Sequence, residues 1–369
     1  MKIAIHQPRA SYYIGGGERI PLEQAKYLDK LGHKITIITS DIKNKSSLFS
    51  DFKKNCPRVK IEAFEPSDKL KKIYKTDLGQ NRRRCDQESL EFGRMTRKYY
   101  VENKFDVVAV HYTVDAVFIP DNQKVVLHLH GCPAKKRDID SRSIKRADYL
   151  VAVSKYVGNF WKKMYGIRRP ISLAYNGVNV RYFYPKAVNK KTDILYVGRL
   201  IKIKGVGDLI RAVAIARNRM PKLKVALIGK GPEKRNLVSL TKRLKITPNV
   251  VWMDSVSDKK LVDMYNNSRL CVFPSTAKEG VLTTMLEAAA CGSAIITTDS
   301  CSMPEFIVHG KNGFLAAPNS PADISSAIVR LLADEHLRNS FGISAESSIR
   351  RNWTWEKRIK ELVEIYKNV

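Results

Sequence analysis

Short apolar runs rich in β-branched residues recur along the chain, and helical patterns separate them. In the first forty residues, Ile3-Ala4-Ile5 predicts a buried strand, a helix is expected from Pro21 to Gly32, and residues 35–39 predict a second strand. A strand, a helix and a second strand in this order form a βαβ unit, which needs a parallel sheet. Repetition of this unit predicts an α/β fold built on parallel sheets.

The length of the chain predicts two domains, because 369 residues exceed what one hydrophobic core usually holds. Strand patterns occur at 105–111, 124–131, 149–154 and 171–179, and a second series occurs at 193–200, 225–229, 250–253, 270–274 and 294–298. The polar stretch after Tyr184 predicts a linker between the two series. We therefore expect domains at residues 1–185 and 186–354. A last helical pattern at 355–369 follows no strand and is expected to pack back on the first domain.

The stretch from Val272 to Gly292 predicts a strand, a loop and a helix in succession. Glu279 falls in the loop, and Glu287 falls about one turn inside a helix that is expected to begin at Thr283. One interpretation is that both carboxylates are solvated charges near the end of a helix. The other is that both belong to a site, because an acid among Leu286 and the alanines that follow Glu287 is expensive to bury without a partner.

Three cations follow the strand predicted at 193–200, namely Arg199, Lys202 and Lys204. Basic residues between the end of a strand and the start of a helix suit phosphate binding, since arginine supplies a forked donor and lysine a point charge. The amides of Gly280 to Leu282 precede another helix and would attract an anion in the same way. The alternative interpretation of these cations is an exposed, solvated loop.

Histidines end two of the strands predicted in the first half, at His111 and at His128 and His130. Side chains alternate along a strand, so His128 and His130 are expected to face the same way. His130 is expected at the carboxyl end of its strand, where open α/β sheets bind ligands, whereas a packed core histidine fits His128 better. A metal site on the two histidines is an alternative, although no later His or Asp stands at ligand spacing.

Three consecutive glycines, Gly15 to Gly17, lie between the first predicted strand and its helix. They do not form the Gly-x-Gly-x-x-Gly pattern of a dinucleotide site. A glycine run before a helix still lets the backbone approach a ligand closely, and a plain flexible loop is the alternative.

The composition is strongly basic, with 66 Lys and Arg against 36 Asp and Glu and a formal charge of +30. Such a charge favours anionic partners, but neither a helix-turn-helix nor a zinc finger supports specific nucleic-acid binding. A basic run contains cations that suit either a solvated helix face or an anionic membrane surface. The run comprises Lys69, Lys71, Lys72, Lys75, Arg82, Arg83 and Arg84.

The six cysteines show no regular spacing, so neither a zinc site nor a disulfide framework is expected, and reduced thiols fit a cytosolic protein. No apolar stretch approaches the ~18 residues of a membrane span. The sequence therefore predicts a cytoplasmic protein, at most peripheral on the inner face of a membrane.

With these elements placed, the sequence resembles the retaining glycosyltransferases of the "glycosyl transferases group 1" family. The resemblance covers nearly the whole chain. It is most specific in four segments of the second half, YVGRLIKIKG, LIGKGPE, KEGVLTTMLEAAACG and SMPEFIVHGKNGFL. Looser matches in the first half are GGGER, HLHG and YNGVNVRYFYP.

The resemblance implies the GT-B fold, in which two Rossmann-like parallel-sheet domains face each other across a cleft. It implies transfer of a sugar from a nucleoside-diphosphate sugar to a glycan, lipid-linked or other acceptor hydroxyl, in the setting of cell-envelope polysaccharide synthesis. Neither a cofactor nor a divalent metal is implied. A metal-dependent glycosyl-processing enzyme, using Asp138-Ile139-Asp140 or the two histidines, is the alternative, and a basic nucleic-acid-binding protein is a further one.

The resemblance also implies roles for single residues. Arg199 and Lys204 would neutralise the leaving diphosphate, and Glu287 would bind the ribose hydroxyls. Glu279 would hold sugar hydroxyls. The remaining implied roles are contact of the donor sugar by His130, binding of sugar and phosphate by the amides of Gly280, Val281 and Leu282, and closure over the diphosphate by the loop of Gly16 and Gly17.

Three positions depart from the family pattern. Gly280 is followed by Val281, Leu282 and Thr283, where members often carry Glu-Gly-Phe-Gly or Glu-Gly-x-Pro. Ser300 to Met303 stand where a glycine pair commonly precedes Pro-Glu, and Lys278 places a cation before the first acid. These departures concern the identity of the sugar more than the reaction.

Overall fold

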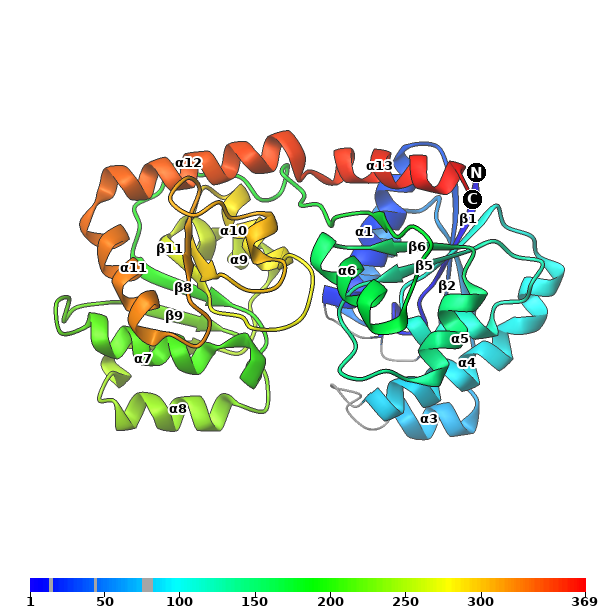
Figure 1. The fold of residues 1–369 in the computed structure, drawn as a ribbon, viewed down its shortest axis with the longest axis horizontal. Helices are drawn as coiled ribbons and strands as arrows, with labels where there is room; N and C mark the ends of the chain where they lie inside the picture. The colour runs from blue at the N-terminus through cyan, green and yellow to red at the C-terminus, as the bar shows by residue number, and fades with distance from the viewer. Residues whose placement is uncertain (13–15, 43–44, 75–81) are drawn as a thin grey trace. The chain divides into compact units, whose positions relative to one another are not determined.

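The structure, a computed structural model, describes residues 1–12, 16–42, 45–74 and 82–369. Its contacts divide the chain into two compact units. Unit 1 comprises Met1–Tyr175 and Trp355–Val369, and unit 2 comprises Asn176–Thr354. Each unit contains one parallel sheet with helices packed on it (Figure 1). The α/β fold with two parallel sheets is therefore confirmed.

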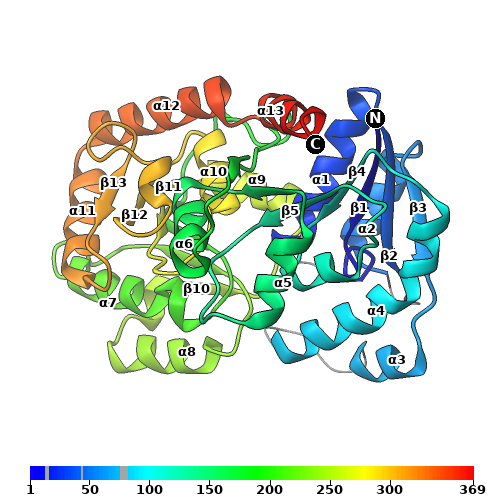
Figure 2. The ribbon, with the colours of Figure 1, turned by 45° about the vertical axis from the view of Figure 1, so that its right-hand side comes forward.

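The sheet of unit 1 has the strand order β3-β2-β1-β4-β5-β6-β7, and β1, β2 and β3 lie side by side (Figure 2). Its strands are β1 (Lys2–His6), β2 (Lys34–Ser40), β3 (Lys60–Phe64), β4 (Val107–Val110), β5 (Val125–Leu129), β6 (Tyr149–Ala152) and β7 (Ser172–Leu173). The order runs outward in opposite directions from the pair β1 and β4. The carboxyl ends of these two strands therefore flank a switch point, where such sheets bind ligands.

The helices of unit 1 cover both faces of its sheet. They are α1 (Gly16–Lys30), α2 (Ser47–Asn55), α3 (Asp68–Tyr74), α4 (Arg82–Glu102), η1 (Thr113–Phe118), α5 (Asp138–Arg146), α6 (Lys155–Tyr165) and α13 (Trp355–Lys367). One apolar core joins α1, α2 and α13 to the sheet, and a second joins α4, α5 and α6 to it. The C-terminal helix α13 lies beside α1 (Figure 1).

The sheet of unit 2 has the strand order β10-β9-β8-β11-β12-β13. Its strands are β8 (Thr192–Val197), β9 (Val225–Ile228), β10 (Val250–Met253), β11 (Ser268–Phe273), β12 (Ala294–Thr298) and β13 (Phe314–Ala316). In this sheet the strand order runs outward in opposite directions from the pair β8 and β11. These two strands pair in parallel, with Leu270 opposite Ile194. The loops that follow β8 and β11 thus flank the switch point of unit 2.

The helices of unit 2 are η2 (Lys202–Lys204), α7 (Val206–Ala216), α8 (Lys234–Arg243), η3 (Thr247–Asn249), α9 (Asp258–Asn266), α10 (Thr283–Ala290), η4 (Met303–Glu305), α11 (Pro321–Ala333) and α12 (Glu335–Asn352). A single core joins α7, α8 and α11 to the sheet, whereas α9 and α10 contact β11. The helix predicted at Thr283 is α10, and Glu287 is its fifth residue.

Local chemistry explains where α6 begins and ends. The hydroxyl of Ser154 accepts a hydrogen bond from the amide of Val157 and caps α6, and Gly166 ends it at φ 65° in the left-handed region. Both devices satisfy backbone groups that a helix end leaves free. They act within one turn of the chain, so sequence alone can show them.

Three expectations differ from the structure. Helix α1 begins at Gly16, five residues before Pro21, so the proline lies inside the helix, where it cannot donate a hydrogen bond to the carbonyl of residue 17. Strands β3 and β13 were not predicted, since KIEAF is half polar and FLA is three residues long. The predicted linker belongs to unit 2, which begins at Asn176, and the amide of Lys186 donates to the side chain of Asn266 in that unit at 2.6 Å.

Candidate active site

Two loops at the switch point of unit 2 carry the predicted cations and the first predicted acid. The chain leaves β8 into Arg199 and then η2, which ends at Lys204. It leaves β11 into the loop that contains Glu279 and then enters α10. Because β8 and β11 are neighbours, residues 75 positions apart in sequence meet at one edge of the sheet.

Lys204 and Glu279 form an ion pair between the Nζ of the lysine and the Oε1 of the acid. The lysine side chain is 9% exposed and the glutamate side chain 25%. Burial lowers the pKa of Lys204, and the neighbouring carboxylate offsets part of that shift. The pair therefore forms a largely desolvated contact of opposite charges, in which Coulomb interactions are stronger than in water.

Hydrogen bonds fix the two loops. The amide of Thr276 donates to the carbonyl of Ile203 at 2.9 Å and joins one loop to the other. The hydroxyl of Ser302, which follows β12, donates to the carbonyl of Glu279 at 2.6 Å. Gly205 has φ 69°, and a Cβ built there would lie 1.9 Å from the carbonyl oxygen of Pro274. Only glycine therefore allows the loop that carries Lys204 to approach the end of β11.

The N-terminus of α10 lies directly beyond Glu279. Its N-cap residue, Leu282, supplies no side-chain hydrogen bond. Within the described part of the chain, no hydrogen bond is made by the amides of Gly280, Val281 and Leu282. Free amides at a helix start carry partial positive charge and point along the axis, so this end of α10 can bind an anion.

Glu287 is buried within α10, with 7% of its surface exposed. Its Oε2 accepts a hydrogen bond of 3.0 Å from the hydroxyl of Tyr265 in α9. Burial, together with the adjacent carboxylate, raises the pKa of Tyr265 well above its ordinary value. Tyr265 is a partner that the sequence pattern did not indicate, because it lies 22 residues away. Tyr265 thus holds one oxygen of the buried carboxylate in a fixed position.

Arg199 is exposed, in contrast to Lys204. Its backbone carbonyl accepts a hydrogen bond of 3.0 Å from the hydroxyl of the buried Tyr196, which fixes the backbone at the start of the loop. No ion pair or hydrogen bond of the Arg199 side chain occurs among the described residues. The guanidinium is therefore available to a ligand.

Unit 1 brings His130 next to His111, a neighbour that was not predicted as its partner. His128 and Val126 share one face of β5, so His128 and His130 face the same way as expected, and His111 follows β4 on that face. Nδ1 of His111 lies 2.9 Å from Nε2 of His130. Burial lowers the pKa of His130 to about 4 and that of His128 to about 3, so both rings are neutral near pH 7.

The glycine loop is only partly described. Gly15 lies outside the described residues, and Gly16 and Gly17 are the first two residues of α1. The prediction that both belong to a loop is therefore wrong, because the helix extends one turn ahead of Pro21. Their position at a helix start still leaves their amides without intrahelical partners.

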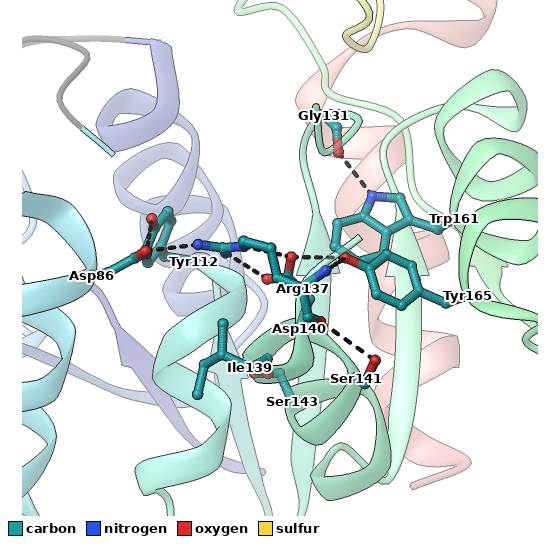
Figure 3. A network of polar contacts seen from close by, with 10 residues as sticks. All are labelled: Asp86, Tyr112, Gly131, Arg137, Ile139, Asp140, Ser141, Ser143, Trp161 and Tyr165. Atoms are coloured by element: carbon teal, nitrogen blue, oxygen red, sulfur yellow. Dashed lines mark hydrogen bonds and ion pairs between the residues drawn. The ribbon is translucent and has the colours of Figure 1, made fainter. Parts of the chain in front are cut away.

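The predicted Asp-x-Asp pair serves another purpose in the structure. Asp140 is fully buried and accepts from the guanidinium of Arg137 at 2.8 and 2.6 Å, while Asp138 is exposed. Arg137 also reaches Asp86 at 2.7 Å, and Tyr165 donates to Asp140 at 2.8 Å (Figure 3). Both oxygens of Asp140 are thus engaged by side chains of the same unit, and Asp140 has a structural role there.

This network supports the segment that follows His130. The indole of Trp161 donates to the carbonyl of Gly131 at 2.8 Å, and the amide of Arg137 donates to the hydroxyl of Tyr165 at 3.2 Å (Figure 3). Helix α6, which carries both aromatic residues, therefore holds both ends of the connection between β5 and α5.

The basic run of unit 1 is partly paired. Lys69 lies 2.7 Å from Glu91, and Lys71 lies 3.2 Å from Glu65. These exposed pairs fit the solvated interpretation of the run. Lys75 lies outside the described residues, and the side chains of Arg82 and Arg83 are not described.

Two further features of the described chain bear on the expectations. All six cysteines are free thiols. None of the helices in the described ranges has the length and apolar character that crossing a membrane requires.

Comparison with known families covers both units. The model described as "Glycosyl transferases group 1" matches residues 183–348, and that described as "Glycosyltransferase Family 4" matches residues 14–182. The chain belongs to the group 1 glycosyltransferases.

Relatives of this glycosyltransferase agree with that assignment. An uncharacterized glycosyltransferase of Methanocaldococcus jannaschii is 28% identical over 61% of this chain, and the match spans 59% of the relative's length. The N-acetyl-alpha-D-glucosaminyl L-malate synthase of Bacillus anthracis is 23% identical over 96% of this chain and 94% of its own. The Anabaena protein HepE, solved with UDP and glucose, has a TM-score of 0.80 at 17% identity, with all of both chains covered. The glycosyltransferase therefore has the GT-B fold.

Proposed function

We propose that this glycosyltransferase moves a sugar from a nucleoside diphosphate to a hydroxyl of a glycan or lipid-linked acceptor, with retention of configuration and without a metal ion. The observation that carries this proposal is the meeting of Lys204, Glu279 and the uncapped start of α10 at the switch point of unit 2. A buried cation and a free helix N-terminus together suit a diphosphate.

Each residue has a defined part in this reaction. The bond between the anomeric carbon and the diphosphate oxygen breaks, and the negative charge that develops on that oxygen is stabilised by Lys204 and Arg199. The amides of Gly280, Val281 and Leu282 bind phosphate and sugar oxygens. Glu279 binds sugar hydroxyls. Lys204, which forms an ion pair with Glu279, faces the phosphate. The acceptor oxygen bonds to the anomeric carbon and transfers its proton to the departing diphosphate oxygen.

The nucleoside is assigned to Glu287, which accepts hydrogen bonds from the ribose hydroxyls. Support comes from its burial in α10 and from Tyr265, which orients the carboxylate. His130 contacts the donor sugar, and the amides at Gly16 and Gly17 approach the diphosphate. HepE, which shares the fold, was solved with UDP and glucose, and this supports a nucleotide sugar as donor.

The reaction needs no metal in this proposal, since Lys204, Arg199 and the α10 amides supply the positive charge. The setting in cell-envelope polysaccharide synthesis, the cytoplasmic location and the contact of the basic run with a membrane surface are parts of the same proposal. The local ion pairs of Lys69 and Lys71 show that part of the positive charge is balanced within the protein.

The test is a thermal-shift screen of nucleotide sugars followed by a transfer assay with the donor that stabilises the protein. A donor at ~100 times its dissociation constant adds ~2.7 kcal/mol of apparent stability. We expect one donor to stand out, full turnover in excess chelator, and an α-linked product from an α-linked donor by NMR. Loss of turnover in chelator would contradict the metal-free reaction, and an inverted product would contradict retention.

A further inference from the structure

A hollow of about 760 Å³ lies at the amino ends of three neighbouring strands of unit 2, β9, β8 and β11. This amino-end hollow is lined by residues of the segments 189–193 and 220–224, together with Arg269 and Leu332. The candidate catalytic residues follow the carboxyl ends of β8 and β11. Since β8 has six residues, the two ends of that strand are about 20 Å apart. The hollow is therefore separate from the candidate active site.

Apolar side chains form part of the lining, and the core of unit 2 holds them in place. Met220 and Leu223 belong to the connection between α7 and β9, and Leu332 belongs to α11. All three pack in the same core, and α7 and α11 lie side by side (Figure 1). Charges beside such an apolar wall are screened less than charges that water surrounds on every side.

The charged side chains of the lining are mostly cations, and its one acid is already engaged. Asp193 lies 3.3 Å from the guanidinium of Arg269, and its Oδ2 accepts a hydrogen bond of 2.8 Å from the amide of Lys224. Lys190 is engaged as well, because its Nζ donates to the carbonyl of Ser268 at 2.9 Å. These contacts leave the acid with little capacity to balance the other cations.

Three lysines of the lining, Lys191, Lys222 and Lys224, carry the positive charge that is not balanced locally. They are exposed, and their side chains make neither an ion pair nor a hydrogen bond with the described residues. The basic run of unit 1 differs, since Lys69 and Lys71 pair with nearby acids. A hollow with clustered positive charge attracts anions.

Two other uses of these lysines fit the structure less well. Cations often offset the negative charge at helix ends, as Arg338 does by donating to the carbonyl of Leu331 in α11 at 2.9 Å, but the three lysines contact no carbonyl of the described chain. Binding of single-stranded nucleic acid relies on aromatic side chains that stack on bases, and the lining contains none. The volume instead falls within the range of small-ligand sites.

We propose that the amino-end hollow binds the phosphate group of a small ligand that lacks an aromatic base, either free or on a lipid headgroup. Lysine ammonium groups are strong donors to phosphate oxygens, and three of them match the charge of a phosphomonoester or diphosphate. The apolar wall contacts the uncharged part of the ligand. This site does not depend on the proposed function, because its residues belong to the other edge of the sheet.

The first test uses methyl NMR of the full-length protein titrated with inorganic pyrophosphate. Met220 lines the hollow, whereas Met285 is buried in α10 and reports on the carboxyl edge. We expect the ¹³C-methyl signal of Met220, assigned with Met220→Leu, to shift and saturate. A response of Met285 with a different midpoint would represent a second, separate site at the carboxyl edge.

Variants then test whether the lysines cause the binding. Lys222→Ala with Lys224→Ala should weaken the Met220 response at least about 10-fold, because hydrogen bonds to charged groups are the stronger class. The matched control is Lys242→Ala with Arg243→Ala, which removes two exposed cations at the end of α8 that do not line the hollow. Its affinity should stay within about 2-fold. Equal weakening in the two double variants would overturn the site by showing general attraction to a basic protein.

Vesicle sedimentation distinguishes the two sources of phosphate. The same proteins are mixed with phosphatidylcholine vesicles that contain or lack phosphatidylglycerol. Loss of binding to the anionic vesicles in the hollow variant but not in the control assigns a lipid headgroup. Equal vesicle binding in all proteins, together with the loss of pyrophosphate binding, assigns a free phosphate. If Met220 does not respond to pyrophosphate and vesicle binding is equal in all proteins, the inference is wrong.

Discussion

The end of β11 in unit 2 and the end of β5 in unit 1 carry the two groups of candidate site residues, and the two groups differ in charge. In unit 2 a buried lysine is paired with a carboxylate beside a free helix N-terminus. In unit 1 buried histidines are neutral and hydrogen-bonded to one another. The difference teaches that a diphosphate needs fixed positive charge, whereas sugar hydroxyls need neutral donors and acceptors with fixed directions.

The largest effect is expected from loss of the buried lysine of unit 2. Lys204→Ala should lower kcat by about 10²- to 10³-fold, because a preorganised group that stabilises the leaving-group charge is removed. Lys202→Ala is the matched control, since Lys202 is an exposed cation of the same turn, η2. Its kcat should stay within about 2-fold, as expected for a screened surface charge. Steady-state kinetics with the donor from the screen measures both, and equal losses would remove the distinction between buried and exposed cations.

A smaller effect is expected from changes to the residues proposed to bind the nucleoside. Glu287→Gln should raise KM for the donor by about 10-fold with kcat little changed, because hydrogen bonds to a charged acceptor are stronger than those to a neutral one. Tyr265→Phe removes one hydrogen-bond donor of that carboxylate and should raise KM by less than about 3-fold, within the value of one ordinary hydrogen bond. Initial rates across donor concentrations measure both. A normal KM for Glu287→Gln would assign the carboxylate a purely structural role.

The smallest effect on turnover is expected when the pH is changed, because the buried histidines of unit 1 stay neutral. Between pH 8 and 6, kcat should change by less than about 2-fold through His130, because its pKa of about 4 keeps the ring neutral throughout that range. Stability should behave differently. In the unfolded chain histidines take up protons near pH 6.5, while His6 and His128 in the fold have pKa values of about 3.

The sign of this pH effect follows from the lowered pKa values. The unfolded state binds more protons below pH 6.5, so the histidine contribution to stability is complete above that pH and is lost progressively as the pH falls toward 3. Urea unfolding should therefore give equal midpoints at pH 8 and 7 and a falling midpoint below pH 6.5. A constant midpoint down to pH 4.5 would contradict the burial of neutral histidines and would weaken the contrast between the two units.

Features that depend on neighbouring residues were predictable from the sequence. The parallel α/β class follows from the repeated strand and helix patterns, and α6 and α10 begin where capping and helix-forming residues place them. The shared face of His128 and His130 follows from the alternation of side chains along a strand. The start of α1 differs from the prediction, because the helix extends ahead of Pro21 and includes it.

Features that depend on distant residues appeared only in the tertiary structure. Sequence alone determined the class of fold, the spacing of Glu279 and Glu287 and the loop of cations, because these are properties of short segments whose periodicity and backbone chemistry are local. The order of the strands decided which side chain each of these residues contacts. That order places Lys204 on Glu279 across 75 residues, His111 beside His130 across a strand pair, and Tyr366 on His128 across 238 residues. Burial of these groups, and hence their pKa values, depends on the whole fold and is not written in any one segment.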